Sequence, residues 1–201
     1  MTIIDLTIEK SRRQNAVKRA RERGTGPVLA WAAAEIARQD PDAVMASLHS
    51  DHVIAPNEAF QQLLVAAARC AVQHQRLLTI GVTPTRPETG YGYLKPGARL
   101  DVEFDAYDVQ QFIEKPDREL ATQYIQRGYL WNSGLFVWPV RLFLDEVAQH
   151  SPEIAPCLPR ALEGDTAGFF KDVPNISVDE AVLERSEKVG VMPATFLWDD
   201  V

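Results

Sequence analysis

The order of apolar and polar residues predicts strands and helices along most of the chain. The predicted strands are short apolar runs of strand length, and they cover residues 42–48, 77–82, 109–113 and 135–138. The predicted helices repeat apolar residues three or four positions apart, and they cover residues 27–36, 60–71, 118–127 and 140–148. The residues that mark the ends of these elements are clearest between residues 109 and 139.

Proline, aspartate and glycine mark the ends of the elements in this stretch. Pro116 stops the strand at 109–113, because proline lacks the N–H that a continuing strand would donate. Asp117 can cap the helix at 118–127 with its side chain. Gly128 suits the left-handed position that commonly follows a helix. These signals place the neighbouring polar residues close to strand ends.

Three of those polar residues suggest a binding site. Glu114 and Lys115 follow the strand at 109–113, and Asn132 lies beside the start of the strand at 135–138. In open α/β sheets, ligands bind outside the carboxyl ends of strands. A carboxylate and an amide suit sugar hydroxyls, and an ammonium suits a phosphate. Spacing alone is equally consistent with a solvated surface ion pair and a turn asparagine.

Length and composition favour one compact domain. The chain has 201 residues, of which 46% are hydrophobic, enough for a sizeable core. No apolar run approaches the 18 residues typical of a membrane span, and the N-terminus lacks the pattern of a secretory signal. Cys70 and Cys157 lack the spacing of metal ligands, which favours free thiols. We therefore expect a cytoplasmic protein that does not enter the membrane.

The charge is unevenly distributed. The first 23 residues carry seven basic and three acidic residues, a net charge of +4, so the rest carries −11 of the total of −7. An acidic body argues against a nucleic-acid partner. The basic start is more typical of a solvated helix face than of a binding arm. We treat residues 1–22 as a segment of uncertain role and residues 23–201 as the domain.

Several stretches, in chain order, resemble one enzyme family. Residues 83–93 read Thr-Pro-Thr-Arg-Pro-Glu-Thr-Gly-Tyr-Gly-Tyr, and residues 112–116 read Phe-Ile-Glu-Lys-Pro. Residues 128–136 read Gly-Tyr-Leu-Trp-Asn-Ser-Gly-Leu-Phe, residues 176–184 read Ile-Ser-Val-Asp-Glu-Ala-Val-Leu-Glu, and residues 196–201 read Phe-Leu-Trp-Asp-Asp-Val. Together they resemble the sugar-phosphate half of mannose-1-phosphate guanylyltransferases, the GDP-mannose pyrophosphorylases.

The resemblance implies a fold and a reaction. The implied fold is the α/β nucleotide-diphospho-sugar transferase fold, a Rossmann-like, mixed and mostly parallel sheet with helices on both faces. The implied reaction converts mannose 1-phosphate and GTP to GDP-mannose and pyrophosphate. The partners are then a small sugar phosphate and a nucleotide, and the sequence leaves open whether the chain forms a homo-oligomer.

The resemblance also implies roles for individual residues. Asp51, in the Ser-Asp-His that follows the strand at 42–48, and Asp200 would hold Mg²⁺, which prefers carboxylates together with phosphate oxygens and water. Lys115 would neutralise the sugar phosphate and is, with Asp51, a catalytic candidate. The implied substrate contacts are Gly92, Glu114, Lys115, Asn132 and Asp179, and the implied nucleotide contacts are Thr25 and Asp51.

Other interpretations apply to some of these positions. His49 replaces a proline that is usual in the family, and His49 with His52 around a carboxylate would also fit zinc, although no third ligand has suitable spacing. Ser177 and Glu180 are spaced as a capping box, which accounts for both without a ligand. Asp179 then remains the candidate for sugar contact in that stretch.

The family's N-terminal glycine-rich loop, which holds the triphosphate, has no counterpart in this sequence. We therefore expect an N-terminally incomplete domain with little or no turnover. The alternative is a catalytically silent subunit that binds sugar phosphates or nucleotide sugars in the same pocket. The absent loop favours that alternative, and the presence of both Asp51 and Asp200 argues against it.

Overall fold

The computed structural model describes residues 24–101 and 103–200. The basic segment 1–22, whose role the sequence leaves open, lies outside the described residues. Within the described residues, no helix has the length and apolar character needed to cross a membrane.

The chain divides into two compact units. The helical unit comprises, in its described part, residues 24–45 and 140–186. The sheet unit comprises residues 46–139 and 187–200. Each unit is made of two segments that are far apart in the sequence, so each depends on long-range packing.

The helical unit is built around α2 (Thr25–Ala37), which packs against α5 (Val140–His150) and α6 (Leu158–Leu162). Small side chains let neighbouring helices approach closely. Three alanines of α2 are fully buried: Ala30, Ala33 and Ala34. The other elements of this unit are short: η1 (Ala155–Cys157), α7 (Thr166–Asp172) and the π-helical turn η2 (Asp179–Leu183).

The main sheet has six strands in the order β1-β6-β3-β7-β5-β4. Their bounds are β1 (Val44–Ser47), β3 (Leu77–Val82), β4 (Tyr93–Asp101), β5 (Ala106–Ile113), β6 (Leu130–Pro139) and β7 (Val189–Pro193). The predicted mixed sheet is confirmed. The predicted predominance of parallel pairing is not: β3 and β7 are parallel, but the β3–β6, β4–β5, β4–β6 and β5–β7 ladders are antiparallel. An apolar run indicates a buried strand without indicating its direction.

β3 is the centre of this sheet, with all six of its residues buried. α3 (Asn57–His74) packs against β6 and β3. α4 (Arg118–Gln126) contributes Ala121 and Tyr124 to an apolar cluster. The other buried members of that cluster are Val82, Tyr93, Tyr129 and Trp131.

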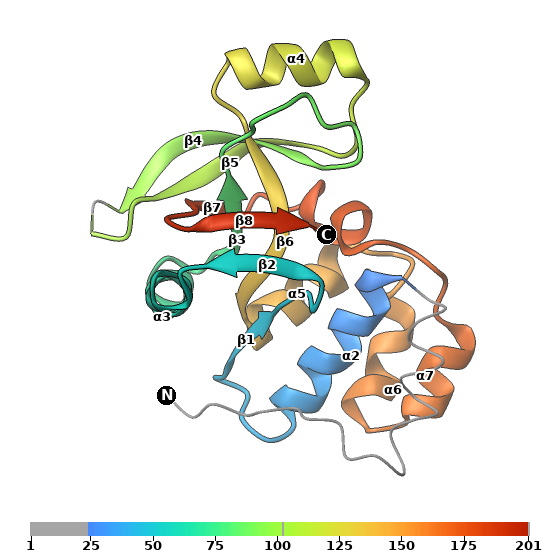
Figure 1. The fold of residues 1–201 in the computed structure, drawn as a ribbon. Helices are drawn as coiled ribbons and strands as arrows, with labels where there is room; N and C mark the ends of the chain where they lie inside the picture. The colour runs from blue at the N-terminus through green and yellow to red at the C-terminus, as the bar shows by residue number, and fades with distance from the viewer. Residues whose placement is uncertain (1–23, 102, 201) are drawn as a thin grey trace. The chain divides into compact units, whose positions relative to one another are not determined.

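β2 (His52–Ala55) and β8 (Leu197–Asp200) form a separate two-stranded antiparallel ribbon (Figure 1). One face of the ribbon is open to solvent, since Val53 is 57% and Leu197 78% exposed. On the other face, the indole N–H of Trp198 donates to Nδ1 of His52 at 3.1 Å. A two-stranded ribbon is marginally stable by itself, so this half-buried face matters for its stability.

The predicted capping residues at three element ends are confirmed. The Asp117 side chain accepts from the Leu120 N–H at 2.8 Å, which caps α4. Gly128, just past that helix, has φ +76°. Ser177 Oγ accepts from the Glu180 N–H at 3.1 Å, and Glu180 Oε2 lies 3.5 Å from the Ser177 N–H, as a capping box requires.

One boundary differs from the prediction in a way that affects the site. β6 begins at Leu130, so Asn132 lies inside the strand and not beside its start. The polar residues there interrupt the apolar pattern, but the backbone still pairs with two neighbours. Trp131 is the register partner of both Tyr93 and Val82.

Candidate active site

Three strands of the sheet unit bring Gly92, Glu114 and Asn132 together. Gly92 directly precedes β4, Glu114 directly follows β5, and Asn132 lies in β6. The Asn132 N–H donates to the Gly92 carbonyl at 2.8 Å. A Cβ at position 92 would lie 2.8 Å from Glu114 Oε2 and 3.4 Å from Asn132 Cβ. Glycine at position 92 thus leaves the Glu114 carboxylate its place, because a Cβ there would have to displace it.

The Asn132 side chain is held by donors that the sequence analysis missed. Thr79 Oγ1 donates to Asn132 Oδ1 at 2.7 Å, and the Gly134 N–H lies 3.4 Å from the same oxygen. Thr79 is fully buried in the middle of β3. A lone hydroxyl inside an otherwise apolar strand needs a partner, and that was the signal available in the sequence.

Lys115 is paired and conformationally constrained. Its Nζ lies 3.0 Å from Glu114 Oε1, and the side chains are 63% and 22% exposed, respectively. Its φ of +46° lies in the left-handed region, which costs a non-glycine residue ~1–2 kcal/mol. Strain of this kind recurs at functional sites. Here the backbone turns sharply at the end of β5, next to Glu114.

Asp51 and Asp200 occupy neighbouring positions across the ribbon. Asp200 is the register partner of His52, and Asp51 directly precedes His52. Burial, followed by the neighbouring His49, lowers the pKa of His52, and the two carboxylates only partly offset this. These effects together favour the neutral form of the His52 imidazole. Carboxylates suit a divalent cation such as Mg²⁺, although Asp200 contributes no atom to the group of candidate ligand atoms around Asp51 that lie within 4.8 Å of one another.

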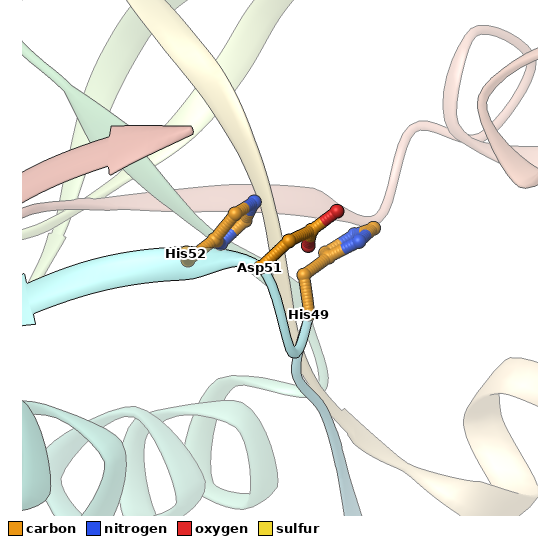
Figure 2. A group of neighbouring side chains, drawn as sticks. All are labelled: His49, Asp51 and His52. Carbon is orange, nitrogen blue, oxygen red and sulfur yellow. The ribbon is translucent and has the colours of Figure 1, made fainter. Parts of the chain in front are cut away.

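Two imidazoles, of His49 and His52, accompany the Asp51 carboxylate (Figure 2). The candidate ligand atoms of His49, Asp51 and His52 all lie within 4.8 Å of one another. The two imidazole rings are stacked, with centroids 4.7 Å apart. A Cβ at position 134 would lie 2.7 Å from His49 Nε2, so the ring of His49 sits against the backbone of β6 at Gly134. Gly134 therefore lies against His49 on one side, while its N–H faces the side-chain oxygen of Asn132.

The loop at 83–92 is held in place by interactions that its motif did not reveal. The Glu88 carboxylate accepts from the Thr89 and Gly90 N–H groups and pairs with Arg86 at 3.2 Å. The Gly90 N–H, followed by Arg86, lowers the pKa of Glu88. These contacts give Glu88 a structural role in shaping the loop that ends at Gly92.

Aromatic rings connect this loop to the ribbon. The ring of Tyr91 contacts the rings of Trp131 and Trp198 edge-on, at centroid distances of 5.3 and 5.6 Å. Burial, followed by the Asp200 carboxylate, raises the pKa of Tyr91. Tyr91 therefore ties the loop to both β6 and the ribbon, the elements that carry Asn132 and Asp200.

The last two candidates lie in the helical unit. Thr25 is the first residue of α2, and its Oγ1 accepts from the Val178 N–H at 3.0 Å. Asp179, the next residue, begins η2. The structure therefore brings Thr25 and Asp179 near one another, and it gives the Thr25 hydroxyl a structural partner. Six candidates belong to the sheet unit: Asp51, Gly92, Glu114, Lys115, Asn132 and Asp200.

A family model and curated relatives of similar sequence indicate one family. The nucleotidyl transferase family model matches residues 5–201. Xanthan biosynthesis protein XanB of Xanthomonas campestris is 40% identical over 189 residues, which is 89% of this chain and 39% of the relative. A putative mannose-1-phosphate guanylyltransferase of Vibrio cholerae is 36% identical over 189 residues, which is 89% of this chain and 40% of the relative. The chain thus spans about two fifths of the length of these curated relatives.

Solved structures of similar fold support the same assignment. Mannose-1-phosphate geranyltransferase from Thermus thermophilus matches with a TM-score of 0.82 and 31% identity, over 94% of this chain and 59% of that one. UDP-glucose pyrophosphorylase complexed with UDP-glucose matches with a TM-score of 0.52 and 13% identity, over 86% and 56%, respectively, and so shares the fold alone. The predicted resemblance and the predicted fold, apart from its mostly parallel pairing, are confirmed, and the match over nearly the whole sequence shows that the chain belongs to the nucleotidyl transferase family.

Proposed function

We propose that this chain carries the sugar-phosphate side of a mannose-1-phosphate guanylyltransferase. The observation that carries the proposal is the convergence of Gly92, Glu114 and Asn132 from three strands, with Lys115 paired to Glu114. The name of the Vibrio cholerae relative and that of a mannose-1-phosphate guanylyltransferase from Klebsiella pneumoniae, 35% identical, support the choice of substrates.

The residues fit complementary tasks. In the proposed reaction a phosphate oxygen of mannose 1-phosphate attacks the α-phosphorus of GTP, and the bond to the leaving pyrophosphate breaks. No protein nucleophile is required, because positioning and charge neutralisation dominate phosphoryl transfer. Lys115 neutralises the sugar phosphate, while Glu114 accepts hydrogen bonds from sugar hydroxyls. Asn132, oriented by Thr79, also contacts the sugar.

Asp51 and Asp200 are the proposed ligands of Mg²⁺. The carboxylate pair supplies the oxygen ligands that this ion prefers. When bound, the ion would neutralise charge on the nucleotide phosphates. Thr25 and Asp179 are proposed contacts to the nucleotide and the sugar, respectively. Because both lie in the helical unit, their assignment rests on the motifs alone.

Titration calorimetry of the purified chain tests the proposal. Mannose 1-phosphate should bind, and Glu114→Gln should bind it more weakly, because an amide replaces a charged acceptor of sugar hydroxyls. Glu119→Gln changes an exposed glutamate of α4 and is the matched control, expected to bind as the wild type does. Absence of binding by both mannose 1-phosphate and GDP-mannose at millimolar concentration would overturn the proposal. Pyrophosphate release by the same preparation tests the expectation of low turnover separately.

A further inference from the structure

The loop that leads into β2 carries two histidines that the proposed reaction does not use. His49 and His52 lie on either side of Asp51 in the sequence, and Figure 2 shows the three side chains grouped at this loop. His49 and Asp51 are exposed and His52 is half-buried, so an ion in solution can reach them. The chain has four histidines, and two of them are in this group.

The donor set differs from what Mg²⁺ uses. Mg²⁺ takes oxygen ligands in a near-octahedral arrangement. Imidazole nitrogen suits zinc, nickel, copper and iron ions, and a carboxylate completes such sites readily. Two imidazoles and one carboxylate also match the three protein ligands of open zinc sites, where a fourth position is left for water or substrate. The group therefore resembles a transition-metal site more than a magnesium site.

The geometry is close to what such an ion needs. With metal–ligand distances of ~2.0–2.2 Å, ligand atoms of a tetrahedral site lie roughly 3.4 Å apart. Here they lie within 4.8 Å of one another. Rotation of the exposed His49 and Asp51 side chains can close this gap. His49 is already confined on one side, because its ring sits against Gly134, where no side chain intervenes.

We propose that His49, Asp51 and His52 bind a transition-metal dication of the zinc class, with open coordination positions left for water or a phosphate oxygen. The ion would join the two stacked histidine rings to the carboxylate that lies between them in the sequence. The inference shares Asp51 with the proposed magnesium site, so the two ions would compete for this carboxylate, but it can be tested apart from the reaction because the metal ion alone is the probe.

Trp198 competes with the metal ion for His52. A neutral imidazole has one nitrogen with an available lone pair. In His52 that nitrogen is Nδ1, which accepts from the Trp198 indole at 3.1 Å. Metal binding at His52 must end this hydrogen bond, whichever nitrogen then holds the ion. The Trp198 indole should consequently change its environment when the metal binds.

The test is metal binding by the full chain, freed of metal with a chelator. Titration calorimetry should detect binding of Zn²⁺ in the presence of excess Mg²⁺. Under the same conditions, Co²⁺ should give a visible absorption spectrum typical of a low coordination number. His49→Ala and Asp51→Asn should weaken binding at least as much as the ~10–100-fold loss seen when a supporting residue of a metal site is removed. His74→Ala, which removes a histidine of α3 outside the group, should bind as the wild type does.

Tryptophan emission supplies a second readout. Adding Zn²⁺ should change the emission of the wild type, and this change should be absent in Trp198→Phe, which should bind Zn²⁺ more tightly. Circular dichroism and melting of each metal-free variant establish that it is folded. Equal Zn²⁺ affinity in the wild type, His49→Ala and Asp51→Asn would overturn the proposal. Weaker binding by Trp198→Phe would overturn the competition between Trp198 and the metal.

Discussion

At the scale of single residues, Glu114 and Lys115 acquire their importance from neighbours that the sequence does not place beside them. Gly92 gives the Glu114 carboxylate its space, and the ion pair with Lys115 holds it at 3.0 Å. Because Lys115 is 63% exposed, solvent screens the pair, and it contributes little to stability. In our proposal, Lys115 instead presents a cation where a sugar phosphate would bind.

Lys115→Ala should weaken binding of mannose 1-phosphate without unfolding the chain. A hydrogen bond to a charged group is worth about 1.5–3 kcal/mol, which corresponds to a roughly ten- to hundredfold rise in Kd. Titration calorimetry measures the change. Lys171→Ala, at an exposed lysine of α7, is the control and should leave Kd unchanged. An unchanged Kd in Lys115→Ala would remove this lysine from the site.

A second residue-scale prediction concerns Glu153 in the helical unit. Both of its oxygens accept from Arg185, at 2.9 and 3.0 Å, and Arg185 lowers the pKa of Glu153 from 4.5 to about 2. A lowered pKa in the folded state stabilises it above pH 4.5, and this contribution is lost as the pH falls from 4.5 towards 2. Both side chains are about one third exposed, so screening keeps the contribution at ~1 kcal/mol or less.

Glu153→Gln should therefore lower the free energy of unfolding at pH 7, and its difference from the wild type should shrink below pH 4.5. Urea denaturation at a series of pH values measures this. Glu163→Gln, at an exposed glutamate of the same unit, should show a much smaller difference at pH 7. A gap that stays constant down to pH 3 would contradict the assigned role of Arg185.

At the scale of elements, β6 is the strand that organises the candidate site. It pairs with β3 and β4, carries Asn132, and shifts its register against β3 between Thr79 and Gly81. Close to this shift, Gly134 adopts φ +72° and makes room for His49. An irregularity of this kind commonly re-aims side chains next to a functional site. The glycine is thus part of the site although it contacts no substrate in our proposal.

Gly134→Ala should destabilise the chain more than Gly128→Ala. Both glycines have a positive φ, +72° and +76°, so an alanine at either one is strained by ~1–2 kcal/mol. At position 134 the added Cβ would also lie 2.7 Å from His49 Nε2, whereas at position 128 it would meet nothing within 4 Å. Urea denaturation of the two variants gives the comparison. Equal losses would indicate that His49 moves away without cost.

At the scale of the whole molecule, the chain is two units, each assembled from two separated segments. Six of the candidate residues belong to the sheet unit, whereas Thr25 and Asp179 belong to the helical unit. A ligand that binds only the native chain stabilises it by mass action. Ligand binding therefore offers a way to detect the proposed pocket through global stability.

Saturating mannose 1-phosphate or GDP-mannose should raise the Tm of the chain. A ligand at a hundred times its Kd adds about 2.7 kcal/mol to the stability of the native state. Differential scanning fluorimetry measures the shift, and Glu114→Gln should shift less than the wild type at the same ligand concentration. No shift at millimolar ligand would contradict a working sugar-phosphate pocket.

The sequence by itself determined the local features and the family. The Asp117 cap, the Gly128 position and the capping box at Ser177 involve groups three or four residues apart, so neighbouring residues suffice to specify them. The span of β3 also followed from its apolar run, because a strand buried on both faces needs apolar residues throughout. The motifs around Glu114 and Asn132 indicated the family, and the comparisons confirm that family.

Only the tertiary structure decided how these pieces meet. Strand direction, the pairing of His52 with Asp200 and the contact of His49 with Gly134 join residues that are distant in the sequence. Such pairings depend on which strands become neighbours, and the apolar pattern of one strand does not specify its partner. The zinc alternative for His49 and His52 was disfavoured in the sequence because no further ligand has suitable spacing, and that spacing does not specify the conformation of the loop. Asp51 lies between them in the sequence, but the fold of the loop places all three side chains within reach of one ion.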